Sequence, residues 1–298
     1  MIKEKIEKLK KEKNAVILAH FYQKDEVQDI ADYVGDSLAL SKIAANTKAD
    51  VIVFCGVYFM AETAKILSPE KKVLLPKLNS LCRMAQMIDY EELKAYKESN
   101  PKTMIVTYVN TRANIKALSD IIVTSSNAEK IVKNFPNKKI MYVPDKNLGT
   151  YLKHVTKQDI SVWPGFCYIH DLLTKKEIEN MRLEHPKAKV LVHPEAPLKV
   201  LLEADFVGST KNILDYATKS DAKEFIIGTD KGLIHALEKQ NPNKSFFLLS
   251  HGLNCLNMKR ITVEDVYESL KAEKHEIDVE PDIQKKAIIA LDRMMELS

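Results

Sequence analysis

One pattern occurs three times along this 298-residue chain, and it constrains the fold more than any other feature of the sequence. Each copy begins with a short apolar run that ends in a polar side chain, at His20, Tyr108 and His193. A small hydroxyl residue follows 17 positions later in every copy, at Ser37, Ser125 and Thr210. A single cysteine closes each copy, at Cys82, Cys167 and Cys255. Three similar units around a pseudo-threefold axis explain such a long-period repeat.

Strand-like runs alternate with helical segments along the chain. The apolar runs cover 15–19, 51–54, 73–75, 104–107, 139–143, 160–162, 190–192, 225–227 and 246–249. Helical patterns such as 90–99 and 230–240 lie between many of them. This alternation is typical of parallel sheets covered by helices. We therefore expect an α/β fold of three pseudo-symmetric three-layer domains, with short parallel sheets around a central active site.

The repeat also predicts the domain boundaries. We expect a first unit over 1–88, a second over 89–172 and a third over 173–259, with a C-terminal helix in 260–298 packing back onto the first. Near the N-terminus, Ile2, Ile6 and Leu9 recur at helical spacing, which predicts a surface helix there.

The composition excludes several classes of protein. Hydrophobic residues make up 45% and charged residues 29% of the chain, as in folded globular proteins. A formal net charge of +4 is too small to indicate a nucleic-acid-binding face. The longest uncharged apolar stretch, 51–61, is about half the roughly 20 residues that a membrane-spanning helix needs, and the first 13 residues have no signal-peptide core. We expect a cytoplasmic protein that binds neither nucleic acid nor membrane.

The four cysteines indicate a metal site more than a disulfide framework. They lie far apart, and no CxxC pair with zinc or ferredoxin spacing occurs. Each of the three repeated cysteines, taken alone, could be a small buried apolar residue. Taken together, equivalent positions around one axis bring three thiols to one centre, which suits a metal cluster. Cys55 lies inside an apolar run without a counterpart, so we expect it in the core.

A four-iron cluster normally takes four thiolates, so three would leave one iron open as a Lewis acid. In parallel α/β units, ligands bind beyond the carboxyl ends of the strands. The side chains there that can donate, accept or move protons are His20, Tyr22, Tyr108, Asn110, His193 and Glu195. The three repeated hydroxyls fit helix N-caps, and helix N-termini also bind carboxylates and phosphates. His170, His235 and His251 lie near motif ends but cannot be told from structural histidines.

Eight segments in this order and spacing resemble one family. They read AHFYQ at 19–23, DIADYVGDS at 29–37, GVYFMAE at 56–62, YVNT at 108–111, PDKNLG at 144–149, HPE at 193–195, FVGST at 206–210 and CLNMK at 255–259. From residue 17 to about residue 259 the chain is similar to quinolinate synthase, the A-protein of de novo NAD biosynthesis.

The resemblance implies a three-domain pseudo-symmetric fold with one [4Fe-4S] cluster on Cys82, Cys167 and Cys255. The implied reaction condenses iminosuccinate with dihydroxyacetone phosphate to quinolinate, releasing phosphate and water. The substrate-binding positions that carry over are His20, Ser37, Tyr108, Val109, Asn110, Ser125, His193, Pro194, Glu195 and Thr210. The catalytic roles fall to Glu195, His193, Tyr22, Tyr108 and His20. The supplier of iminosuccinate, expected to be L-aspartate oxidase or aspartate dehydrogenase, is an implied functional partner.

The sequence departs from the family pattern at Phe21, Arg83, Arg112 and Ala196. Arg83 directly follows the first repeated cysteine, where an inward-pointing guanidinium would alter substrate preference or the cluster potential. Three other functions stay open at this point. They are an iron–sulfur hydro-lyase acting on another hydroxy acid, a cluster-bearing sensor without turnover, and a protein with a structural zinc site.

Overall fold

The computed structural model describes residues 2–298 and contains twelve strands in three sheets. The first sheet consists of β1 (Ala15–His20), β2 (Tyr33–Gly35), β3 (Val51–Cys55) and β4 (Lys72–Leu74). The second consists of β5 (Met104–Tyr108), β6 (Ile121–Val123), β7 (Ile140–Val143) and β8 (Ile160–Val162). The third consists of β9 (Lys189–Val192), β10 (Phe206–Val207), β11 (Glu224–Gly228) and β12 (Ser245–Leu248).

The helices, in chain order, are α1 (Ile2–Glu12), α2 (Asp25–Gln28), α3 (Ser37–Asn46), α4 (Tyr58–Leu67), α5 (Tyr90–Ser99), α6 (Ala113–Leu118), α7 (Ala128–Lys133), α8 (Lys146–Thr156), α9 (Lys175–Glu184), α10 (Leu198–Leu201), α11 (Thr210–Lys219), α12 (Gly232–Gln240), α13 (Val263–Ala272) and α14 (Pro281–Leu297). Two single turns of 3-10 helix are η1 (Met84–Gln86) and η2 (Met258–Arg260).

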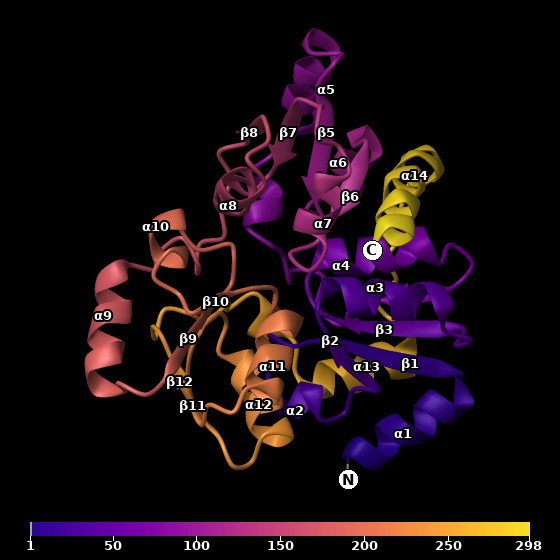
Figure 1. Cartoon of the computed structure of the whole chain (residues 1–298). Coiled ribbons are helices and arrows are strands. Elements are labelled where there is room, and N and C mark those ends of the chain that lie inside the picture. The colour runs from indigo at the N-terminus through magenta and orange to yellow at the C-terminus, as the bar shows by residue number, and fades with distance from the viewer. Residues whose placement is uncertain (1) are drawn as a thin grey trace.

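The three sheets have the same topology. Their strand orders are β2-β1-β3-β4, β6-β5-β7-β8 and β10-β9-β11-β12, with parallel pairing throughout. Figure 1 shows them as three lobes, with β5–β8 at the top and the other two sheets below. In the first lobe, α1 and α13 pack together on one side of the sheet and α3 and α4 on the other. The expected α/β fold of three pseudo-symmetric units with short parallel sheets is confirmed.

An aspartate is bonded to the first strand in the same way in each unit. The pairs are Asp32 with Ile17, Asp120 with Ile105, and Asp205 with Val190. In each pair a carboxylate oxygen accepts from the strand N–H at 2.7–2.9 Å. The N–H of the aspartate donates back to the carbonyl of the same strand residue at 2.9–3.0 Å. Because these two bonds recur at the same spacing, the sequence repeat corresponds to equivalent positions in space.

Three of the strands escaped the sequence analysis, which predicted nine. The missed strands are β2, β6 and β10, one in each sheet at the same place in the repeat. Each has two or three residues and pairs with a neighbour on one side only. In β2 and β10 only two consecutive apolar residues precede a glycine, which is too few for a pattern to be recognised. β6 is as long and as apolar as the predicted run 73–75, so its length does not set it apart.

The C-terminal segment packs on two of the lobes. Helix α13 contacts α1 and β3 of the first lobe. Helix α14 packs mainly against α6 and β6 of the second lobe and in part against α4 of the first, as Figure 1 shows at the upper right. The sequence analysis assigned all of 260–298 to the first unit. Each of the ranges 1–88, 89–172 and 173–259 contains one complete sheet, and the division at these boundaries stays a prediction.

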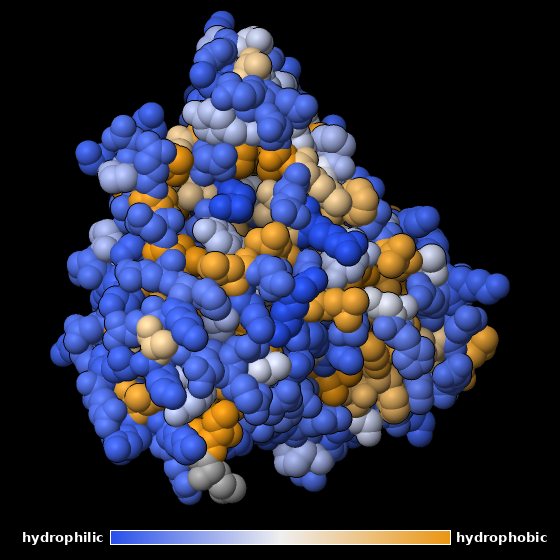
Figure 2. Space-filling view, turned by 180° about the vertical axis from the view of Figure 1, so that it is seen from behind, coloured by the Kyte–Doolittle hydropathy of each residue, from blue (hydrophilic) through white to orange (hydrophobic). Residues whose placement is uncertain are grey.

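The strands of the sheets and the helices that cover them together form the core, and charged residues cover the outside. Side chains such as Ile17, Val106 and Leu191 are fully buried. Seen from behind, the surface is mostly hydrophilic, with apolar patches near the middle of that face (Figure 2). Within residues 2–298, no helix combines the length and the apolar character that a membrane span requires.

Candidate active site

A cavity lies where the first strands of the three sheets end. In each sheet the second strand pairs on one side of the first strand, and the third strand pairs on its other side. The carboxyl end of the first strand is therefore a topological switch point, where α/β proteins bind ligands. The predicted site residues that line the cavity are His20, Tyr22, Ser37, Cys82, Tyr108, Asn110, Ser125, Cys167, His193, Glu195, Thr210 and Cys255. Two predicted residues, Val109 and Pro194, are buried but do not line it.

The three repeated cysteines share this cavity. They follow the last strand of each sheet in turn, and all three are partly buried free thiols. Burial raises the pKa of Cys82 to about 12 and also raises the pKa values of Cys167 and Cys255. The Glu195 carboxylate and the neighbouring thiols add to the rise for Cys167. Because all three cysteines line one cavity, their thiolates would repel one another there. A cationic iron centre would remove this repulsion, so the donor set fits the cluster that the family resemblance implies.

Cys55 lies apart from this group. It ends β3 inside the first sheet, is fully buried, and has its pKa raised by burial alone. The prediction that Cys55 belongs to the core is confirmed.

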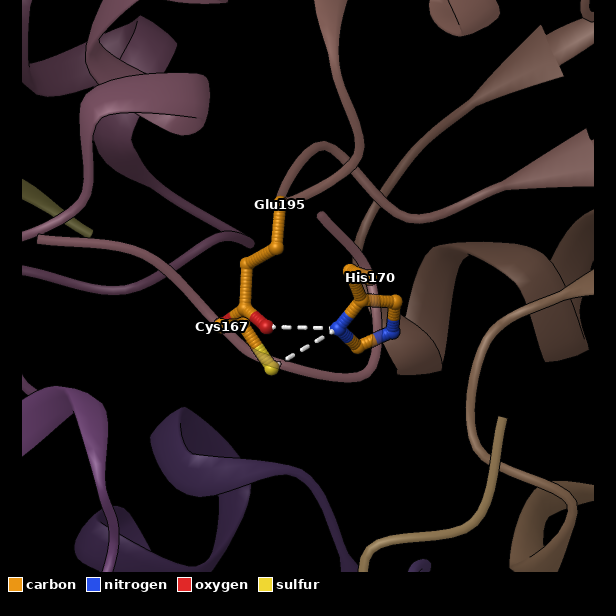
Figure 3. Close-up of side chains that lie close together, drawn as sticks. All are labelled: Cys167, His170 and Glu195. Atoms are coloured by element: carbon orange, nitrogen blue, oxygen red, sulfur yellow. Dashed lines mark hydrogen bonds and ion pairs between the residues drawn. The ribbon is translucent and has the colours of Figure 1, made fainter. Parts of the chain in front are cut away.

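His170 connects one of these thiols to the acidic residue of the site (Figure 3). Its Nδ1 lies 2.8 Å from an oxygen of Glu195 and 3.2 Å from the sulfur of Cys167. One ligand atom from each of these three residues lies within 4.8 Å of the others, so the group could hold a metal ion. His170 is fully buried. The sequence analysis left its role open, although its place three residues after Cys167 was an available signal.

The carboxyl group of Glu195 is held by donors on both oxygens. Tyr108 donates to Oε1 at 2.7 Å, and the Asn110 amide approaches the same oxygen at 3.4 Å. His170 lies at Oε2. Burial opposes ionisation, but the hydrogen bonds from His170 and Tyr108 hold the pKa of Glu195 below its usual range. Glu195 is therefore a buried, ionised carboxylate.

His20 and His193 are held in the same orientation at equivalent positions. The backbone N–H of Tyr22 donates to Nδ1 of His20 at 3.1 Å, and that of Glu195 donates to Nδ1 of His193 at 3.3 Å. Burial lowers the pKa of each imidazole to about 3. Both rings are thus neutral at pH 7, and because Nδ1 accepts, Nε2 carries the proton. They are donors rather than cationic acids, and His193 uses Nε2 toward Ser125 at 3.2 Å.

A hydrogen-bonded chain links the first strand end to Glu195. The Tyr22 hydroxyl lies 2.5 Å from Thr229 Oγ1, which lies 3.0 Å from His170 Nε2. Because ionised Glu195 can only accept, His170 donates to it through Nδ1, and the Thr229 and Tyr22 hydroxyls continue the chain from Nε2 of the ring. Thr210 lies 3.0 Å from the same Tyr22 oxygen. Burial raises the pKa values of Tyr22 and Tyr108, so both phenols keep their protons at neutral pH.

The repeated hydroxyls are not the N-caps that the sequence indicated. Asp36 caps α3 and Ser209 caps α11, so Ser37 and Thr210 occupy the first helical position instead. Asn127 stands before α7, two residues after Ser125. The cap is one residue earlier in α3 and α11 because Asp36 and Ser209 can reach the third helical N–H. The Thr210 hydroxyl instead lies at Tyr22 and that of Ser125 at His193, so these hydroxyls belong to the hydrogen-bond network of the cavity.

The four departures from the family pattern take different places. Phe21 and Ala196 are buried apolar side chains. Arg112 forms a 3.0 Å ion pair with Glu62 and lies over the ring of Tyr58, outside the cavity lining. Arg83 does line the cavity.

The Cys255 loop depends on a buried aspartate that the sequence analysis did not single out. Asp230 accepts from the N–H of Cys255 at 2.6 Å, from the N–H of Gly232 at 2.8 Å and from Lys259 Nζ at 2.5 Å. Its side chain is fully buried.

The fold and the site define a class of α/β protein in which three equivalent units enclose one thiol-lined cavity with a buried carboxylate. Sequence comparison agrees with this class, since the profile of the family described as quinolinate synthetase A protein matches residues 4–296. The chain therefore belongs to the quinolinate synthase family.

Relatives match over nearly their whole length. Identity is 53% with the quinolinate synthase of Caldicellulosiruptor saccharolyticus, over 100% of this chain and 98% of the relative. It is 49% with that of Aquifex aeolicus, over 100% and 94%. It is 47% with quinolinate synthase 2 of Methanosarcina acetivorans, over 100% and 96%.

Proposed function

We propose that this protein condenses iminosuccinate with dihydroxyacetone phosphate to quinolinate, releasing phosphate and water, as a step of NAD biosynthesis. The observation that carries the proposal is the meeting of three repeat-related thiols, neutral histidine donors and an ionised Glu195 in one cavity. The names of the relatives, all quinolinate synthases, support the same product.

Cys82, Cys167 and Cys255 would hold a [4Fe-4S] cluster. When bound, a cluster with three thiolate ligands supplies one open iron that acts as a Lewis acid and promotes loss of water. The buried position of the thiols supports this assignment because three neighbouring thiolates need a cation to be stable there.

Glu195 is the base in this proposal. It is ionised, and its two oxygens are fixed by Tyr108 and His170. It can take a proton from carbon as the triose enolises and return a proton when water leaves. The chain from His170 through Thr229 to Tyr22 gives that proton a path across the cavity wall.

The other lining groups bind the anionic ends of the substrates. Nε2–H of His20 and of His193 can donate to carboxylate or carbonyl oxygens. Ser37 and Thr210 add hydroxyls at the first turns of α3 and α11, where capping leaves the first backbone N–H groups free for carboxylate or phosphate. Asn110 and Ser125 contribute donors from the second unit.

Iminosuccinate is an imine that water hydrolyses, so its supply must be linked to its use. We propose a functional link with an enzyme that oxidises aspartate, either an oxidase or a dehydrogenase. No step of the proposed chemistry in this chain requires such an enzyme to stay attached.

A second candidate function rests on the compact group of Cys167, His170 and Glu195. A thiolate, an imidazole and a carboxylate are a common ligand set for a single metal ion with an open position. Such a site would serve a metal-dependent hydro-lyase, and it would need neither Cys82 nor Cys255.

The deciding experiment is product analysis under anaerobic conditions. Cluster-loaded protein is incubated with dihydroxyacetone phosphate and with iminosuccinate generated in situ, and quinolinate is quantified by chromatography and mass. The proposal expects quinolinate and phosphate in equal amounts. Protein loaded with a single metal ion that forms no quinolinate but dehydrates another hydroxy acid, and does so equally well in Cys82→Ala, would support the second candidate.

A further inference from the structure

Tyr168 lies in the loop of Cys167 and contacts the loop of Cys255. It directly follows Cys167, and its hydroxyl donates a hydrogen bond to the sulfur of Cys255 at 3.7 Å. The two residues are 87 positions apart and come from different lobes. Tyr168 itself is half-buried and lines the cavity beside the thiols.

Arg83 brings the third cysteine-bearing loop to the same side chain. It directly follows Cys82, and its guanidinium carbon lies over the Tyr168 ring at 4.9 Å from the centroid. This distance and placement are those of a cation–π contact. The planar guanidinium can stack on the ring where a lysine ammonium could not. A single arginine–tyrosine pair therefore connects the loops of Cys82, Cys167 and Cys255.

The chemistry of the contact favours a role toward a ligand sulfur. A phenol has an ordinary pKa near 10 and so keeps its proton at neutral pH. A metal-bound thiolate accepts hydrogen bonds more strongly than a neutral thiol, because the acceptor is ionised. Hydrogen bonds to ligand sulfurs stabilise the more negative, reduced state of an iron–sulfur cluster and raise its reduction potential.

We propose that Tyr168 is a positioning residue for the cluster, donating a hydrogen bond to the Cys255 sulfur and raising the cluster's reduction potential, while Arg83 holds its ring. This inference rests on the proposed function only in requiring a cluster on the three thiols. It assigns Arg83 to a structural contact rather than to substrate binding.

The test is the midpoint potential of the cluster in the full chain, titrated anaerobically with redox mediators and followed by electron paramagnetic resonance. Tyr168→Phe keeps the ring and its stacking but removes the donor. The matched control is Tyr58→Phe, since Tyr58 lies under Arg112 at 4.3 Å, outside the cavity lining. We expect a more negative potential for Tyr168→Phe and an unchanged potential for the control. Equal potentials for Tyr168→Phe and the parent would overturn the proposal.

The role of Arg83 is tested by comparing Arg83→Gln alone with the same substitution in the Tyr168→Phe background. Arg83→Gln should shift the potential more in the parent than in the Tyr168→Phe background, because its effect passes partly through the phenol. Equal shifts in both backgrounds, or a raised KM with no shift, would overturn this part. Iron and sulfide analysis of the same samples distinguishes failure of the proposed function from failure of the role of Tyr168. A parent without a cluster would overturn the proposed function as well, whereas a cluster of unchanged potential overturns only the role of Tyr168.

Discussion

Tyr108 Oη lies 2.7 Å from Glu195 Oε1, a contact that joins the end of β5 to the loop after β9. Both side chains are buried, and they come from different lobes. Glu195, the proposed base, is thus oriented by a neighbouring unit rather than by its own. The single site is therefore complete only when the units are packed against one another.

Glu195→Gln should abolish most of the activity while leaving the metal content unchanged. The amide keeps the shape but cannot take a proton, so we expect a loss in kcat of about 10²–10⁴-fold, the usual contribution of general acid–base catalysis. Steady-state quinolinate formation measures it. The matched control is Glu203→Gln, an exposed residue paired with Lys175 at 2.5 Å, which should retain parental kcat. Full activity in Glu195→Gln would remove Glu195 from the chemistry.

Asp230→Asn should destabilise the fold near Cys255. The substitution leaves Lys259, whose side chain is only 12% exposed, without its ion-pair partner. Breaking a buried pair on one side costs about 3 kcal/mol or more of unfolding free energy. Urea denaturation of the metal-free chain measures this. Asp215→Asn, which breaks the exposed pair with Lys211, should change stability by less than about 0.5 kcal/mol. Similar losses in the two variants would contradict the account.

Cys55→Ala should retain the full metal content. It removes a buried sulfur from β3, at a cost of about 1 kcal/mol in unfolding free energy for the small space left behind. Metal analysis and urea denaturation of the same preparation check both parts. Loss of metal from this variant would mean that the repeat had selected the wrong cysteines.

Glu273 should make stability depend on pH in the acid range. Hydrogen bonds from Lys13 and Lys72 lower the pKa of Glu273 from 4.5 to about 2. A carboxyl whose pKa is depressed on folding contributes stability above its unfolded value, and the contribution is lost as pH falls toward the folded value. Because the Glu273 side chain is partly exposed and solvent screens the pair, we expect less than about 1 kcal/mol.

The measurement is the difference in unfolding free energy between the parent and Glu273→Gln. It should be constant from about pH 7 to pH 5.5 and shrink as pH falls below about 4.5. A difference that grows on acidification would have the wrong sign for this ion-pair cluster.

The long-period repeat was readable because each unit carries the same polar residues at fixed spacing. Asp32, Asp120 and Asp205 each accept a hydrogen bond from the N–H of a strand residue 15 positions earlier. The same structural contact therefore recurs at the same spacing in the sequence. The three cysteines are readable for the same reason. The repeat gave less information about the role of an individual residue within its unit. Ser37 and Thr210 were predicted to bind substrate, with helix capping as the alternative, and Asp36 and Ser209 are the residues that cap the helices.

The residues that sequence reasoning missed act between units. His170 lies between Cys167 and Glu195, and Thr229 lies between His170 and Tyr22. Neither has an equivalent in the repeat. The place of His170 three residues after Cys167 was a signal in the sequence, whereas Thr229 carried none. Their partners come together only through packing of the three lobes. The position of α14 against α6 is likewise set by tertiary packing, which an amphipathic pattern alone does not specify.

The most direct test of the central claim is the iron, acid-labile sulfide and zinc content of anaerobically purified protein, for the parent and for Cys82→Ala. The account predicts about four irons and four sulfides per parent chain, the content of one [4Fe-4S] cluster, and their loss in Cys82→Ala. One zinc ion per chain without sulfide, retained in Cys82→Ala, would contradict it and point instead to Cys167, His170 and Glu195.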